Sequence, residues 1–167
     1  MSDNFKLQPI QNWLKKNNWF FYDHQLETLN QSMNGYDILL IAPTGGGKTL
    51  AGFLPSLHDL INNNSPENKL HTLYISPLKA LTIDVHRNLT NPIEDQNLDI
   101  RVETRTGDTS SYKKNRQKNV PPHMLMTTPE SLALLLADIK AKEYFKSLRY
   151  LIIDEIHSLV NTKRGDL

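Results

Sequence analysis

Five short apolar runs constrain the fold of this 167-residue chain more than any other feature of its sequence. Each run is nearly continuous in apolar character, which is typical of strands that are covered on both faces. A helical or polar stretch separates each run from the next. This alternation predicts an α/β fold with a mostly parallel sheet and helices on both faces. The runs are residues 37–42 (DILLIA), 70–76 (LHTLYIS), 99–104 (DIRVET), 123–128 (HMLMTT) and 149–154 (RYLIID).

The stretches around these runs predict the helices. Leu7, Ile10 and Leu14 recur at helical spacing, so a first amphipathic helix should end near residues 17–18. A second helix should begin with Asp23 as its N-cap and end at Gly35. Further helices are expected over residues 48–61, 80–89 (stopped before a proline at 92) and 130–137, and residues 107–122 are expected to form a long polar connection.

Composition narrows the function classes only slightly. The chain has 19 Lys+Arg, 18 Asp+Glu and a net charge of +1, so a nucleic-acid surface would have to come from local placement of charge. It has no cysteine, and its six histidines show no paired spacing of the zinc-binding kind. No stretch approaches the length of a membrane span. We therefore expect a soluble, cytoplasmic protein without membrane contact.

A glycine-rich turn between the first apolar run and the next predicted helix reads APTGGGKT. It matches the nucleotide-binding phosphate loop, except that Ala42 replaces the first glycine. Successive backbone N–H groups of such a loop converge on phosphate oxygens, and the positive end of the following helix faces the same charge. The alternative is a glycine-rich turn with an incidental lysine. The predicted nucleotide-binding residues are Thr44, Gly45, Gly46, Gly47, Lys48 and Thr49, with Lys48 reaching the β and γ phosphates and Thr49 offering its hydroxyl to Mg²⁺.

Two adjacent acids follow the last apolar run. At a strand end, Asp154 is expected to hold Mg²⁺ together with Thr49, and Glu155 to align the attacking water. Taken alone, such a pair is more often the solvated start of a helix, but the upstream phosphate loop favours the catalytic interpretation. Lys48, Asp154 and Glu155 are therefore the predicted catalytic residues. His157 is as well explained as an ordinary surface residue.

Six segments occur together in one order: APTGGGKT, ISPLKAL, RTGDT, TTPESLALLL, DEIH and KRGD. In this order and spacing the chain resembles the first motor lobe of superfamily 2 DExH-box helicases. Within that superfamily it is similar to the large helicase-related (Lhr) group, and most to its bacterial ligase-associated branch. The resemblance implies a RecA-like domain over residues 1–167, incomplete at its C-terminus, with residues 1–22 as a helical extension.

The resemblance further implies an ATP-driven, 3′-to-5′ translocase on single-stranded or partly duplex DNA with a role in DNA repair. ATP and Mg²⁺ would be its cofactors, and Gln25 would read the adenine edge. An alternative for Gln25 is a solvated helix position. The residues implied to contact nucleic acid are Ser76, Pro77, Lys79, Arg105, Thr127 and Thr128. Their chemistry suits phosphate contact, although the threonines would serve equally as helix caps, and RTGDT equally as a turn in which Asp108 caps a helix.

The family motor has parts that this sequence does not contain. These are the Ser/Thr-Ala-Thr segment and a second RecA-like lobe with its arginines, and the strand after that segment normally lies between residues 37–42 and 149–154. We therefore expect unpaired backbone groups, marginal stability and aggregation. A DNA ligase or nuclease encoded nearby is a further partner that the resemblance suggests. Rival functions are a nucleotide-binding module without turnover and an unrelated phosphate-loop kinase.

Overall fold

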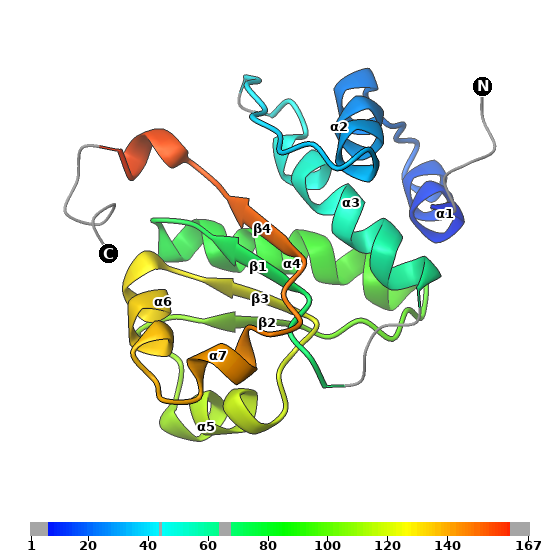
Figure 1. The fold of residues 1–167 in the computed structure, drawn as a ribbon. Coiled ribbons are helices and arrows are strands. Elements are labelled where there is room, and N and C mark those ends of the chain that lie inside the picture. Colours follow the sequence, from blue (N-terminus) through cyan, green and yellow to red (C-terminus); the bar gives the residue numbers. More distant parts are fainter. Residues whose placement is uncertain (1–6, 44, 64–67, 161–167) are drawn as a thin grey trace. The chain divides into compact units, whose positions relative to one another are not determined.

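A computed structural model describes residues 7–43, 45–63 and 68–160, which fall into two compact units. The first unit comprises residues 1–65 and 91–99, and the second comprises residues 66–90 and 100–167. Figure 1 shows the fold, with helices and strands labelled along the chain. Each unit is described by itself.

The first unit is helical. Helix α1 spans Gln8–Lys16, α2 spans Asp23–Met33 and α3 spans Lys48–Asn62. Ile10 and Leu14 of α1 are buried with Leu7 just before it, which confirms the predicted amphipathic helix. Helix α2 packs along α3. It begins one residue earlier than predicted, because Tyr22 and not Asp23 is the N-cap, and Gly35 lies just beyond its end with φ of +84°.

The second unit is built on a parallel four-stranded sheet in the order β2-β3-β1-β4. Its α/β architecture confirms the predicted fold class. The strands are β1 (Thr72–Ile75), β2 (Val102–Arg105), β3 (Met124–Thr127) and β4 (Tyr150–Ile153). Helix α6 (Pro129–Leu136) and the short α7 (Ala141–Tyr144) cover one face, and Leu135 packs there against Leu73, Ile75 and Leu125 (Figure 1).

One predicted strand does not form. Residues 36–43 have no regular secondary structure, and Leu39 and Ile41 are 73% and 86% exposed. A parallel strand needs neighbours to accept and donate its ladder hydrogen bonds. Within the described ranges β4 pairs only with β1, and no strand lies on its other side. The prediction of a strand at residues 37–42 was therefore wrong. A strand needs a neighbour to pair with, and among the described residues none pairs with this run.

Two helices differ from their predicted forms. Helix α4 spans Lys79–Asp95 and contains Pro92, although we expected it to stop before that residue. Pro92 and Ile93 are buried, so packing of the last turn offsets the lost backbone hydrogen bond. Helix α5 (Ser111–Asn119) lies in the stretch predicted as a polar connection. It has no apolar stripe, which explains why periodicity could not reveal it.

Candidate functional site

The phosphate loop leads directly into α3 in the first unit. Gly45 and Gly47 have φ of +77° and +71°, values that favour glycine, and the Gly46 N–H donates to the Pro43 carbonyl at 3.1 Å. The ammonium of Lys48 bends back over the loop to the carbonyls of Ala42 at 2.7 Å and Pro43 at 2.9 Å. Thr49 is exposed in the first turn of the helix. Thr44 lies outside the described residues, so its predicted role is not addressed.

Gln25 is joined to this loop. Its side chain is 2% exposed; its Nε2 donates to the Gly47 carbonyl at 3.0 Å, and its Oε1 accepts from the Tyr22 N–H at 3.0 Å. The alternative of a solvated helix residue is therefore wrong. One N–H and one lone pair of the amide are not used by these two bonds, and an adenine edge would need both. Gly47 has no room for a side chain, because an added Cβ would lie 2.5 Å from Gln25 Nε2.

The acidic pair lies at the end of β4 in the second unit. The Asp154 N–H donates to the Ile75 carbonyl at 2.9 Å, so Asp154 prolongs the β1–β4 ladder by one residue. Its Oδ2 accepts from the Tyr74 hydroxyl at 2.7 Å, and its Oδ1 accepts from the Glu155 N–H at 2.9 Å. The half-buried carboxylate is thus held in place by two neutral donors, one on each oxygen.

Glu155 adopts a backbone conformation that is rare for its residue type. Its φ of 51° and ψ of 41° lie in the left-handed region, where the 3₁₀ turn at Ile156–Ser158 begins. Its Oε2 lies 3.3 Å from His157 Nε2, while the His157 side chain is 78% exposed. Such strained residues concentrate at functional sites. The conformation sends the two adjacent carboxylates into different surroundings, as separate roles in metal binding and water alignment would require.

The acidic pair suits a Mg²⁺ site in which the ion binds one protein carboxylate and the phosphates of the substrate. Across the described ranges, no group of three or more histidine, aspartate or glutamate side chains could hold a metal ion on its own. Asp154 offers carboxylate oxygens, each with acceptor capacity beyond the hydrogen bond that it already makes. This donor chemistry suits a hard cation.

Sequence reasoning missed Tyr74. It is 1% exposed on β1, and burial together with the neighbouring Asp154 raises the pKa of its hydroxyl above the ordinary value. Ser76 also hydrogen-bonds to this hydroxyl. Within an apolar run, Tyr74 looked like a core residue. Its only signal was that a buried tyrosine hydroxyl usually finds a partner.

Most residues predicted to contact nucleic acid are buried within the second unit. Thr127 and Ser76 are fully buried, Pro77 is buried, and Thr127 Oγ1 donates to the Arg105 carbonyl at 2.8 Å. Thr128 is 3% exposed and caps α6, because its hydroxyl accepts from the Ser131 N–H. Their hydroxyls thus serve the fold, which favours the capping alternative for Thr128.

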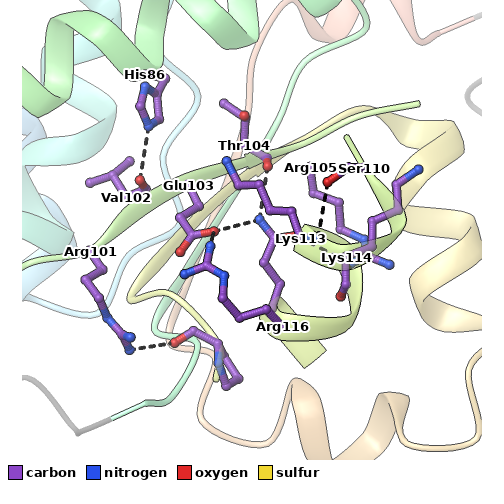
Figure 2. A network of polar contacts seen from close by, with 12 residues as sticks. His86, Arg101, Val102, Glu103, Thr104, Arg105, Ser110, Lys113, Lys114 and Arg116 are labelled. Carbon is purple, nitrogen blue, oxygen red and sulfur yellow. Dashed lines mark hydrogen bonds and ion pairs between the residues drawn. The ribbon is translucent and has the colours of Figure 1, made fainter. Parts of the chain in front are cut away.

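Arg105 belongs to a polar network between β2 and α5 (Figure 2). It is 6% exposed, and its guanidinium donates to the Lys114 carbonyl at 2.9 Å and to Gln117 Oε1 at 3.4 Å. Gln117 in turn donates to Glu103, which also pairs with Arg116 at 2.6 Å. Burial lowers the pKa of the Arg105 guanidinium. The Nη1 donors of Arg105 are thus used inside the protein, and its predicted role in nucleic-acid binding stays a prediction.

Lys79 is the exposed cation of this predicted set. It begins α4, and its ammonium contacts both carboxylate oxygens of Asp108 at 2.9 and 3.0 Å. The side chains of Lys79 and Asp108 are 51% and 80% exposed. Asp108 does not cap the next helix as the alternative proposed, since the Ser110 hydroxyl accepts from the Lys113 N–H and caps α5. Lys114 also donates to the carbonyl of Gly107, so cations from two helices hold the turn at residues 106–109.

Comparison with known families decides the class. Residues 22–167 match the family described as DEAD/DEAH box helicase. The chain belongs to the DEAD/DEAH box helicase family. None of the helices in the described part of this helicase chain is long and apolar enough to cross a membrane.

Several of its helicase relatives are named as Lhr helicases. The chain is 39% identical to ATP-dependent helicase Lhr-Core protein 2 of Thermococcus barophilus, over 94% of this chain and 20% of the relative. It is 37% identical to the Lhr helicase/uracil glycosylase of Escherichia coli, over 84% of this chain and 10% of the relative. The chain thus spans at most about a fifth of these relatives, and the predicted similarity to Lhr helicases is confirmed.

A solved structure agrees with both fold and family. The structure of the Mycobacterium smegmatis helicase Lhr bound to single-stranded DNA and AMP-PNP superposes with a TM-score of 0.82 at 37% identity. The match covers 96% of this chain and 21% of that one. The likeness supports a RecA-like helicase motor fold. The ligase-associated branch remains a prediction.

Proposed function

We propose that this chain is the ATP-binding motor lobe of a DNA helicase, which couples ATP hydrolysis to 3′-to-5′ movement along single-stranded DNA. The observation that carries the proposal is the phosphate loop, with its two left-handed glycines, Lys48 at the start of α3 and Gln25 bonded to Gly47. The Lhr structure that this chain resembles was solved with single-stranded DNA and AMP-PNP. A cytoplasmic location and a role in DNA repair are part of the proposal.

Each residue has a defined task in this function. The Lys48 ammonium leaves the loop carbonyls for the β and γ phosphates, whose charge makes them better acceptors. Gln25 holds the loop through Gly47 and offers its remaining donor and acceptor to adenine. Asp154 and Thr49 would hold Mg²⁺, which supplies positive charge that offsets the charge on the phosphates. Glu155 aligns the attacking water.

Nucleic acid is expected to bind through backbone phosphates. Lys79 supplies an ammonium for such a contact, and no predicted contact residue reads bases. Binding should then tolerate any sequence and weaken with salt. The proposal also includes a second RecA-like lobe and a ligase or nuclease partner. Both concern the full length of the relatives, of which this chain spans at most about a fifth.

Equilibrium binding of AMP-PNP with Mg²⁺ tests the nucleotide site. We expect Lys48→Ala to abolish measurable binding, while Lys146→Ala, a change at an exposed lysine paired only with Glu143, leaves it unchanged. Equal binding by the wild type and Lys48→Ala would contradict the nucleotide site.

A strand-displacement assay tests the direction of translocation on duplex DNA with a single-stranded tail at one end. We expect the paired strand to be displaced only from DNA with a 3′ tail, and displacement from DNA with a 5′ tail would contradict the proposed direction.

A further inference from the structure

The contacts around Asp154 single out a tyrosine on the neighbouring strand. Tyr74 lies opposite Ile152 in the β1–β4 register. Alternate residues of a strand point to the same side of the sheet, so Asp154, two residues beyond Ile152, is a diagonal neighbour of Tyr74. The hydroxyl of Tyr74 reaches Asp154 Oδ2 at 2.7 Å. The backbone register therefore fixes the contact.

The packing around Tyr74 restricts the orientation of its hydroxyl. Tyr74 is 1% exposed, so its ring is held by the surrounding core. Ser76 lies just beyond the end of β1, two residues after Tyr74 and on the same side, and its hydroxyl hydrogen-bonds to the Tyr74 hydroxyl. Each hydroxyl has one proton to donate. With Ser76 bonded to its oxygen, the Tyr74 proton is directed to the carboxylate.

We propose that Tyr74 is a positioning residue for the metal-binding carboxylate: its hydroxyl orients Asp154 so that the remaining lone pairs face the Mg²⁺ of bound nucleotide. This inference rests on the proposed function, because it presumes that Asp154 binds Mg²⁺. Groups that hydrogen-bond to a metal-binding carboxylate fix its orientation, and their removal typically lowers metal affinity or activity 10–100-fold. The Glu155 N–H holds the other oxygen, so both ends of the carboxylate are fixed by neutral donors.

The test measures how much Mg²⁺ improves nucleotide binding. For each variant of the full chain, the dissociation constant for AMP-PNP is measured in EDTA and in saturating MgCl₂. The EDTA value is divided by the MgCl₂ value, and this ratio is compared between variants. Tyr74→Phe removes the hydroxyl and keeps the ring, so we expect the ratio to fall about 10-fold while the EDTA value stays unchanged. Ser76→Ala should lower the ratio less.

A matched control is available in the same sheet. Tyr150→Phe removes a tyrosine hydroxyl at the opposite end of β4, where Tyr150 pairs with Thr72. It should leave the ratio at the wild-type value. Thermal unfolding of each variant separates positioning from folding, because a purely structural defect would weaken binding in EDTA and in MgCl₂ by the same factor.

The outcomes are distinct. If Asp154→Asn lowers the ratio but Tyr74→Phe does not, or if Tyr74→Phe weakens binding equally in both conditions, Tyr74 is not a positioning residue and the proposed function stands. If the wild-type chain does not bind AMP-PNP, the proposed nucleotide site fails together with the inference. If it binds AMP-PNP with no benefit from Mg²⁺, the proposed metal role of Asp154 fails and the inference fails with it, while the nucleotide site stands.

Discussion

At the scale of single residues, the phosphate loop depends on an interlock between Gly47 and Gln25. The loop crosses the amide of Gln25 at a point where no side chain fits, and the Gly47 carbonyl accepts the amide proton. The sequence predicted each residue for its contact with nucleotide. The structure adds that they contact each other, so each is also needed to hold the loop in place.

Substitution of Gly47 tests this interlock. Gly47→Ala should lower the free energy of unfolding more than Gly45→Ala, by about 1–3 kcal/mol, because it also displaces the buried Gln25 amide from its partners. Both glycines have positive φ, so the backbone strain of the two variants is matched, while Gly45 has open space around it. Urea denaturation without nucleotide measures the difference. Equal losses would show that Gln25 does not constrain the loop.

Arg105 offers a second prediction at this scale. Arg105→Ala removes a buried guanidinium from the Lys114 carbonyl and Gln117 (Figure 2), so we expect the free energy of unfolding to fall by about 1–3 kcal/mol. Arg87→Ala, the same change at an exposed position of α4, should alter it by less than about 0.5 kcal/mol. An unaffected unfolding midpoint in Arg105→Ala would mean that the network does not stabilise β2 and α5.

At the scale of elements, the ion pair between Lys79 and Asp108 joins the start of α4 to the turn before α5. A phosphate that binds Lys79 competes with the Asp108 carboxylate, whose two oxygens take two of the three N–H donors of the ammonium. Exposed pairs of this kind are worth only about 0–1 kcal/mol, so the displacement is feasible. Under the proposed function, in which Lys79 contacts a phosphate, this turn would tune how strongly α4 binds nucleic acid.

Fluorescence anisotropy with a labelled single-stranded oligonucleotide tests this competition. Asp108→Asn should tighten binding several-fold, because it frees the ammonium. Lys79→Ala should weaken binding to all sequences alike and reduce the salt slope by about 1. The outcome that would contradict the prediction is an Asp108→Asn variant with wild-type affinity beside a weakened Lys79→Ala.

Strand β4 shows how far sequence reasoning reached at this scale. Its apolar run and the two acids after it were predictable, because a short apolar run followed by charge has a distinct pattern. The failure of residues 37–42 to form a strand was not predicted from the run itself, since pairing depends on a neighbour and not on composition. Helix α5 was missed because a cap at Ser110 and polar contacts of Gln117 stabilise it in place of an apolar face.

At the scale of the whole molecule, apolar surface remains exposed in both units. Ile41 is 86% exposed in the first unit, and Leu151 of β4 is 56% exposed in the second, beside a groove lined by Leu73, Leu132 and Phe145. Exposed strand edges with apolar side chains promote association between chains. If the chain aggregates as expected, we predict that association involves these exposed apolar side chains.

A charge on β4 should reduce this association. Leu151→Lys places an ammonium at the exposed edge, so light scattering at rising protein concentration should fall while the free energy of unfolding stays within about 0.5 kcal/mol of the wild type. Tyr112→Lys, at an 82% exposed position on α5, is the control for added charge. Equal suppression by both variants would assign the effect to net charge and would contradict the role of the β4 edge.

The central proposal is that this chain is the motor lobe of a helicase whose ATP hydrolysis responds to DNA. Steady-state ATPase rates with and without a single-stranded oligonucleotide, for the wild type and for Lys48→Ala, test it most directly. We predict a rate that rises with DNA and is lost in Lys48→Ala. A wild-type rate that ignores DNA, a rate that survives in Lys48→Ala, or nucleotide binding without any turnover would contradict the claim.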